Sequence, residues 1–286
     1  MTGWYVGDRA LIWGQRTYVM GILNITPDSF SDGGDFFNPA SAIAHALDMA
    51  AAGADVIDVG GESTRPGASA IPLSAELARV LPVIEGIRQQ STIPISIDTT
   101  RADVARAAVA AGANIVNDVS GGQADAAMFA TVAQLGVPYI LMHRRGTPAT
   151  MQQLTDYDDL IADLLTYFQE QTHTAIAHGI DPSQIMLDPG IGFAKTTPQN
   201  LLLLKELSRF KSLGYPLLIG PSRKRFIGDI LNQPDPKARV WGTAAVCCHA
   251  IAQGVEMVRV HDVAAIVPVC RMADALQGRD ARISHN

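Results

Sequence analysis

The sequence is poor in charged residues, in aromatic residues and in cysteine, and these shortages exclude whole classes of protein. Charged residues make up 17% and aromatic residues 6% of the 286 residues, while 48% are hydrophobic. A chain of this composition can bury a core and is not disordered. Its formal net charge of -6 lacks the positive excess that a nucleic-acid surface requires. We therefore expect a well-cored protein without a nucleic-acid partner, in which a few locally placed cations hold any anionic ligand.

The three cysteines, Cys247, Cys248 and Cys270, have no metal-ligand spacing. An odd number of scattered thiols predicts buried cysteines in a reducing compartment. The segment Met1–Arg9 lacks a basic region followed by an apolar one, so we expect no signal peptide. The hydrophobic stretch Val240–Val255 is too short to cross a bilayer and is typical of a buried helix. We therefore expect a soluble, cytoplasmic protein with no membrane partner.

Eight short apolar runs recur along the chain, and each meets a polar or charged residue at its carboxyl end. Continuous runs of this kind are typical of parallel strands buried on both faces. The runs are Tyr18–Leu23, Ala54–Ile57, Ile93–Ile97, Ile115–Val116, Tyr139–Met142, Ile185–Leu187, Leu217–Gly220 and Met257–Val260.

Helical, mostly alanine-rich segments lie between these runs, and several end at a glycine suited to a helix C-terminus. The predicted helices are Pro39–Ala52, Leu73–Gln90, Arg101–Ala111, Ala124–Leu135, Asp158–His178, Gln199–Leu213, the Arg225–Val255 region and Val263–Leu276. The glycines are Gly53, Gly112, Gly136, Gly179, Gly214 and Gly254.

This alternation of strands and helices leaves two folds open, a closed barrel and an open doubly wound sheet. A doubly wound nucleotide fold usually carries a Gly-x-Gly-x-x-Gly turn after its first strand, which the segment Asn24–Phe30 lacks. Eight strands in a chain of this length favour a (β/α)₈ TIM barrel. We expect one α/β domain over residues 1–286, with its barrel core at about 18–276.

Two connections, Asn24–Asn38 and Gly60–Pro72, are unusually long and polar. Long loops inside a compact domain are often functional lids. Both follow strands at the carboxyl end of the barrel, where barrel enzymes place their active sites. Surface decoration is the alternative interpretation.

Acidic and amide side chains at successive strand ends predict a ligand with several N–H donors. Asp98, Asn117 and Asp188 would converge in the barrel mouth, where carboxylates need partners. Alternatively, Asp98 and Asp188 are N-caps of the segments that follow them.

Cations gather near the last strands, where such barrels frequently hold a phosphate. They are Arg65, Lys224 and the pair Arg259 and His261, whose spacing of two puts both side chains on one side of an extended segment. Arg259 could instead pair with a core carboxylate. Asn24 offers an oxygen ligand for a magnesium ion that keeps most of its waters, although asparagine is also an ordinary turn residue. No motif for zinc or for covalent acyl transfer is present.

Two long strings make the chain resemble the dihydropteroate synthases. They are MGILNITPDSFSDGG at Met20–Gly34 and DVGGESTRPG at Asp58–Gly67. The shorter strings IDT, NDVSGG, DPGIGF, SRK and RVHDV follow in order, so that the resemblance covers about Tyr18 to Val267.

The resemblance implies a (β/α)₈ barrel that joins 4-aminobenzoate to 6-hydroxymethyl-7,8-dihydropterin diphosphate, a step of folate biosynthesis. It further implies a magnesium ion, a homodimer and sensitivity to sulfonamides. The implied pterin contacts are Asp98, Asn117, Met142, Asp188, Phe193, Gly220 and Lys224. The implied diphosphate contacts are Asn24, Arg65, Arg259 and His261, with Asn24 also at the metal. The implied aminobenzoate contacts are Thr64, Arg65, Pro66, Phe193, Lys224 and Arg225.

The resemblance also implies catalytic roles for Asp98, Lys224, Arg65, His261, Asp32 and Phe30. Breaking the bond between the pterin methylene and the diphosphate leaves a ring-delocalised cation, which predicts an S_N1-like path with Asp98 stabilising the cation. Position 225 is often serine in the family but is arginine here, so the aminobenzoate carboxylate contact departs from the pattern. Two alternatives stay open: a methyltetrahydrofolate-dependent methyltransferase barrel, and a pterin-binding paralogue without synthase activity.

Overall fold

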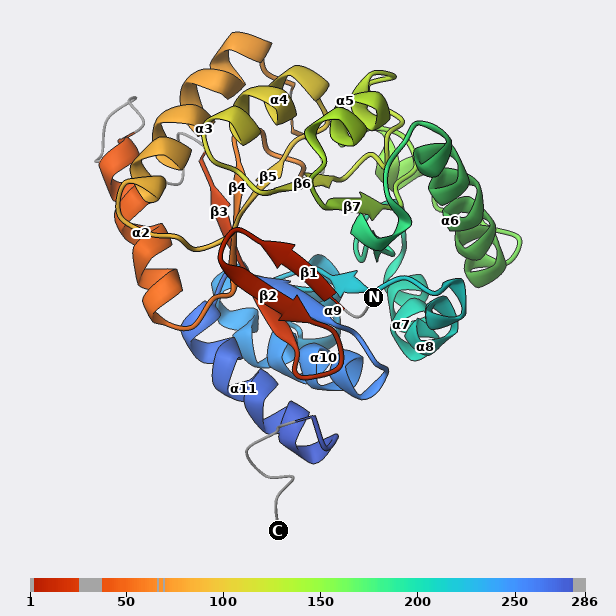
Figure 1. Ribbon diagram of the computed structural model, residues 1–286. Coiled ribbons are helices and arrows are strands. Elements are labelled where there is room, and N and C mark those ends of the chain that lie inside the picture. The colour runs from red at the N-terminus through yellow and green to blue at the C-terminus, as the bar shows by residue number, and fades with distance from the viewer. Residues whose placement is uncertain (1–2, 26–37, 66, 69, 280–286) are drawn as a thin grey trace.

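A closed barrel of eight parallel strands surrounded by helices forms the body of the protein (Figure 1). The computed structural model describes residues 3–25, 38–65, 67–68 and 70–279. The sheet order is β8-β7-β6-β5-β4-β3-β10-β9, and a parallel bridge between Leu187 and Leu217 joins its two ends. The barrel strands are β3 (Tyr18–Asn24), β4 (Val56–Gly60), β5 (Ile95–Asp98), β6 (Ile115–Asp118), β7 (Tyr139–Met142), β8 (Ile185–Asp188), β9 (Leu218–Ile219) and β10 (Met257–Val260). The closed barrel is confirmed, and the doubly wound alternative is wrong.

Helices cover the outer face of this barrel (Figure 1). They are α2 (Pro39–Ala51), α3 (Leu73–Arg88), α4 (Ala102–Ala110), α5 (Met128–Leu135), α6 (Leu160–Ala177), α7 (Thr197–Lys205), α8 (Leu207–Phe210), α9 (Arg225–Leu231), α10 (Val240–Ala252) and α11 (Val263–Leu276). The six glycines expected after helices all have positive φ, as at Gly136 (63°) and Gly112 (118°). A left-handed residue there turns the chain back toward the next strand.

Several predicted boundaries were wrong. Strands β4, β5, β6 and β8 each extend to include the acidic residues that were expected just beyond them. The predicted helix Gln199–Leu213 is two helices and a short 3₁₀ turn, and the predicted helix Ala124–Leu135 begins only at Met128. The Arg225–Val255 region is two helices, because Asn232 ends α9 in the left-handed region (φ 50°) and two prolines follow it.

The floor of the barrel is closed by an N-terminal hairpin that the sequence reasoning missed. Strands β1 (Gly3–Val6) and β2 (Arg9–Ile12) pair antiparallel and cross one end of the barrel (Figure 1). Trp4 is 1% exposed and packs in one cluster with Met20, Ile140 and Met257 of the barrel strands. The hairpin therefore seals the amino-terminal end of the strands and leaves the carboxyl end as the mouth.

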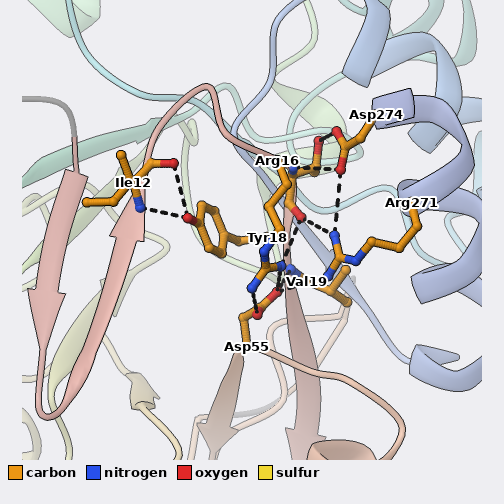
Figure 2. A network of polar contacts seen from close by, with 8 residues as sticks. Ile12, Arg16, Tyr18, Val19, Asp55, Arg271 and Asp274 are labelled. Carbon is orange, nitrogen blue, oxygen red and sulfur yellow. Dashed lines mark hydrogen bonds and ion pairs between the residues drawn. The ribbon is translucent and has the colours of Figure 1, made fainter. Parts of the chain in front are cut away.

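A polar network beside this hairpin ties the first and last elements of the barrel together (Figure 2). Arg16 donates two hydrogen bonds to Asp55, at 2.9 and 2.5 Å. Thr17 donates to the Asp274 carboxylate through its amide and its hydroxyl, and Arg271 donates to the Thr17 carbonyl. Both carboxylates are buried, so these partners satisfy charges that would otherwise be costly.

Two expectations about the apolar C-terminal region are corrected in part. Cys247 and Cys270 are buried as expected, but Cys248 is exposed. Helix α10 buries one face, while Trp241 on the other face is 72% exposed. Among the described residues, no helix is both long and apolar enough to span a membrane.

Candidate active site

Four polar side chains from four strands meet inside the barrel mouth. Arg259 on β10 donates to Asp58 on β4 at 2.5 Å and to Asp98 on β5 at 2.7 Å. Asn117 on β6 donates to the same oxygen of Asp58 at 3.1 Å. Because β3 separates β10 from β4 in the sheet, these contacts require all four side chains to point into the barrel.

Asp58 is a central member of this site that the sequence reasoning missed as a functional residue. Its side chain is fully buried and is shared between Arg259 and Asn117. The signal was available, since Asp58 follows the inward-facing Val56 by two residues and side chains on a strand alternate between faces. The alternative interpretation, in which Arg259 pairs with a core carboxylate, is confirmed by its ion pairs with Asp58 and Asp98.

The two carboxylates in the mouth keep unsatisfied oxygens. Asp58 Oδ1, Asp98 Oδ1 and the hydroxyl of Ser96 are buried without a hydrogen-bond partner among the described residues. Buried acceptors of this kind are rare unless a ligand completes them. Burial raises the pKa of Asp98 to about 7; the charge of Arg259 acts against this and that of Asp58 adds to it.

Asp188, at the end of β8, is a third inward carboxylate. Burial raises its pKa to about 6, although a hydrogen bond from the Gly190 amide (2.8 Å) acts against this change. Neither Asp98 nor Asp188 caps a helix, because the N-caps of α4 and α7 are Arg101 and Thr196. The capping interpretation is therefore wrong for Asp98, whereas Asp188 does cap the turn that follows it, through the bond from the Gly190 amide.

Lys224 and Phe193 form the wall of the mouth beside Asp188. The Lys224 ammonium lies 4.1 Å from the centre of the Phe193 ring, a cation–π contact. Phe193 also belongs to a small apolar cluster with the predicted pterin contact Met142. Burial lowers the pKa of Lys224 to about 8, and the nearby charge of Arg259 lowers it further. Gly220, at the end of β9, lies against the Arg259 side chain.

His261 lies on the rim after β10, where Ser222 holds it. The Ser222 hydroxyl lies 2.9 Å from His261 Nδ1 and accepts from the His261 amide. Burial lowers the pKa of His261 to about 3, and the charges of Arg223, Arg259 and Arg65 add to this effect. The imidazole is therefore neutral, and Nε2 makes no hydrogen bond with the described residues. Arg65 is exposed on the same rim.

The second long loop, Gly60–Pro72, is anchored at its base by Arg101. Its guanidinium donates to the buried Glu76 (3.0 Å) and to the Ile71 carbonyl (2.6 Å), and it lies 3.4 Å from Glu62. These contacts hold both ends of the loop that carries the half-buried Thr64 and the exposed Arg65.

The mouth contains oxygen donors that fit a magnesium ion. Asn24 Oδ1 and Asp98 Oδ2 both lie 3.7 Å from the point that a Cβ on Gly60 would occupy, so the glycine leaves open a space lined by these oxygens. Magnesium prefers such ligands and keeps several waters. The described residues contain no group of three or more His, Cys, Asp or Glu side chains that could hold a metal without further ligands.

Three of the predicted contacts, Phe30, Asp32 and Pro66, lie outside the described residues. Arg225 begins α9 with its side chain 88% exposed and 3.7 Å from Asp229. Its side chain therefore points into solvent and not toward the cluster in the mouth. The remaining predicted residues lie at or beside the carboxyl ends of the strands.

Comparison with known proteins finds similarity to pterin-binding enzymes. The family model described as "Pterin binding enzyme" matches residues 20–261. The chain is 58% identical over 271 residues to the dihydropteroate synthase of Synechocystis sp., covering 95% of this chain and 94% of the relative.

Two solved structures extend the comparison. The Yersinia pestis dihydropteroate synthase in complex with a sulfonamide drug is 40% identical with a TM-score of 0.91, covering 96% of this chain and 99% of that one. The Xanthomonas albilineans enzyme in complex with 7,8-dihydropteroate is 41% identical with a TM-score of 0.85, covering 94% and 97%.

Proposed function

Because the chain belongs to the pterin-binding enzymes and, within them, to the dihydropteroate synthases, we propose the reaction that it catalyses. It joins 6-hydroxymethyl-7,8-dihydropterin diphosphate to 4-aminobenzoate and releases 7,8-dihydropteroate and diphosphate, a step of folate biosynthesis. The observation that carries this proposal is the cluster of Arg259 with Asp58 and Asp98, which places anionic acceptors and a cation in one cavity.

The pterin fits the inward carboxylates and amide. Adjacent ring N–H and amino donors on the pterin edge would form parallel hydrogen bonds to Asp188. The amide of Asn117 would form a further contact with the pterin. The orphaned oxygens of Asp58 and Asp98 support a ligand that donates hydrogen bonds. Met142, Phe193, Gly220 and Lys224 would form the walls against the flat ring.

We propose that the bond to the diphosphate breaks first, by an S_N1-like path. The ring cation that forms would be stabilised by the ionised Asp98, a preorganised electrostatic effect with no need for a strong base. The amine of 4-aminobenzoate is already neutral near pH 7 and would attack the methylene carbon directly.

The departing diphosphate would be held by Arg259, His261, Arg65 and Asn24. Arg259 uses Nε and Nη2 for the two carboxylates, and Nη1 makes no hydrogen bond with the described residues. That group can therefore donate to a phosphate oxygen without breaking the cluster. Neutral His261 can donate from Nε2 while Nδ1 faces Ser222.

Magnesium is part of the proposal, with Asn24 as its protein ligand and the diphosphate and waters as the others. When bound, the ion would neutralise charge on the leaving group. Phe30 and Asp32 of the first long loop would close over the reacting centre, and Thr64, Arg65 and Pro66 of the second would contact 4-aminobenzoate. Because the Arg225 side chain is exposed, a backbone N–H at that position would bind the carboxylate.

A direct assay separates this function from its two rivals. Purified protein given the pterin diphosphate, 4-aminobenzoate and magnesium should release diphosphate and form dihydropteroate, and EDTA should stop the release. A methyltransferase barrel or an inactive paralogue would release none. The cations Arg65 and Arg259 and the neutral donor His261 favour the synthase, because a methyltransferase has no diphosphate to hold.

We further propose that the protein acts as a homodimer in the cytoplasm, where its three free cysteines stay reduced. Support for a dimer comes from α10 and α11, where Met272 and Leu276, 60% and 73% exposed, line a hollow of 280 Å³ and Trp241 on α10 is 72% exposed. Exposed apolar surface of this kind often marks an interface.

The dimer is testable with charge placed on this face. Trp241→Glu combined with Leu276→Glu should produce monomers in sedimentation velocity at micromolar concentration, because buried carboxylates are costly. Tyr5→Glu is the control, since Tyr5 is 69% exposed at the barrel floor. A wild-type protein that sediments as a monomer would contradict the proposal.

A further inference from the structure

The turn that carries Phe193 into the mouth has an unusual backbone. Gly190, Gly192 and Ala194 have φ values of 71°, 81° and 47°. Ala194 is one of three non-glycine residues with positive φ in the described part of the chain. A non-glycine residue in this region costs free energy and persists only where surrounding contacts hold it.

Side chains from two other segments brace this turn. The Asn200 amide oxygen accepts from the Gly192 amide at 2.7 Å, and its nitrogen donates back to the Thr196 carbonyl at 2.8 Å. The Tyr157 hydroxyl donates to the Ala194 carbonyl at 3.0 Å. These hydrogen bonds therefore hold the turn in its strained conformation.

Lys195 is the centre of this bracing. It is 3% exposed, and its ammonium donates to the carbonyls of Gly190 (3.2 Å) and Phe193 (3.1 Å) and lies 3.0 Å from His143 Nδ1. A protonated amine has three N–H donors, and three acceptors surround it. One buried group thus clamps both ends of the turn to the segment after β7.

The partner His143 is suited to accept this bond. Burial lowers its pKa well below the ordinary value, and the Lys195 charge adds to that effect, so the ring is neutral and Nδ1 can accept. The ring is 3% exposed and meets Tyr167 edge-on at 4.7 Å. His143 therefore presents a fixed acceptor. Burial likewise lowers the pKa of Lys195 to about 7, while the charge of Asp188 acts against this change.

We infer that Lys195 is a positioning residue for the reaction: it fixes the turn at 190–194 so that the Phe193 ring stays against the Lys224 ammonium. The inference deepens the proposed function and rests on it where it concerns catalysis. Lys195 acts through Phe193 and touches neither substrate. Nothing in the family resemblance assigned it a role.

Hydrogen exchange tests the clamp independently of any activity. In Lys195→Met, which keeps the length of the side chain but removes its donors, amides of the peptide 190–200 should exchange at least about tenfold faster than in the wild type. Lys211→Met is the matched control, because Lys211 pairs with Glu256 at the barrel floor and should leave this peptide unchanged. Equal protection in Lys195→Met and wild type would overturn the inference.

A double-mutant cycle tests the link to catalysis. Lys195→Met and Phe193→Ala should each lower kcat/KM by about tenfold or more, and the double variant should fall no more than about threefold below Phe193→Ala alone. Effects that multiply would mean that Lys195 acts by another route. If Lys195→Met does not fold, His143→Phe removes one acceptor and enters the same cycle.

Hydrogen exchange and kinetics distinguish a failure of the proposed function from a failure of the inference about Lys195. A wild-type protein without synthase activity defeats the proposed function, while the exchange result still decides whether Lys195 holds the turn. An active wild type whose Lys195→Met variant keeps full kcat/KM overturns only the inference.

Discussion

Asp58, Asp98 and Arg259 form a compact charge cluster in which one cation faces two buried carboxylates. Removing one partner from a buried pair leaves the other uncompensated, so such pairs are sensitive to single substitutions. The sequence indicated that Asp98 and Arg259 would both lie in the barrel mouth, but not that they would form an ion pair. It did not reveal that Asp58 lies between Arg259 and Asn117, because that depends on which inward side chains touch across the barrel.

Asp58→Asn should lower the free energy of unfolding by about 1–3 kcal/mol, because the amide weakens the bond to Arg259 without changing the shape of the site. Urea denaturation at neutral pH measures the change. Asp103→Asn is the control, since Asp103 pairs with Arg106 on the exposed face of α4 and should cost less than about 0.5 kcal/mol. Equal losses in the two variants would contradict the buried role of Asp58.

The raised pKa of Asp98, about 7, gives activity a pH dependence. Only the ionised carboxylate stabilises the pterin cation, so kcat/KM for the pterin diphosphate should rise with pH through about 7 and level off above it. The substitution Asp98→Asn should remove this limb from the pH profile of kcat/KM. If the variant kept the same limb, another group would be responsible.

Stability should change in the opposite direction. Because the folded pKa of Asp98 lies above the unfolded value, its contribution to stability is fully present below about pH 4 and is lost as the pH rises through about 7. Asp188, with a pKa of about 6, acts in the same sense. Denaturation midpoints compared between wild type and Asp98→Asn across this range would measure the loss.

At the scale of single elements, the loops after the strands decide how the site is held. The long connection Gly60–Pro72 was expected to act as a lid, and the structure shows its base fixed by Arg101 through Glu76, Glu62 and the Ile71 carbonyl. Loop length and composition indicated that the segment matters. The sequence did not reveal Arg101 as the anchor, because Arg101 lies beyond the next strand, directly before α4, and pairs with Glu76 of α3.

Arg101→Lys should raise the KM for 4-aminobenzoate several-fold with little change in pterin affinity, because an ammonium cannot reproduce the forked contacts of the guanidinium. Steady-state kinetics and calorimetry with the pterin give the two values. Arg106→Lys, on the exposed side of the same helix, should match the wild type. Equal losses of affinity for both substrates would argue against a local anchor.

Across the whole molecule, the contacts that stabilise the fold at the floor and the residues of the candidate active site lie at opposite ends of the barrel. The hairpin β1–β2 and the Arg16–Asp55 and Thr17–Asp274 contacts close the floor, whereas the carboxylates and cations of the site lie at the carboxyl ends of the strands. The floor can therefore be altered without touching the site.

Trp4→Ala should destabilise the protein by about 3–5 kcal/mol, since it leaves a cavity under the barrel. The folded variant should retain its kcat. Thermal denaturation and initial rates at a temperature below the transition measure both. Its neighbour Tyr5 is 69% exposed, so Tyr5→Ala should leave stability nearly unchanged. A large loss of kcat in Trp4→Ala would show that floor and mouth are coupled.

The sequence by itself determined the number of barrel strands, the glycine turns between helix and strand, and the family strings that carry the site. These are local patterns, written in residues close together along the chain. The tertiary structure alone decided the pairing of Arg259 with Asp58 and Asp98, from which it is separated by 201 and 161 residues, and the clamp of Lys195 on His143, 52 residues away. The reason is physical: strand periodicity sets which side chains face inward, but only closure of the barrel sets which of them meet.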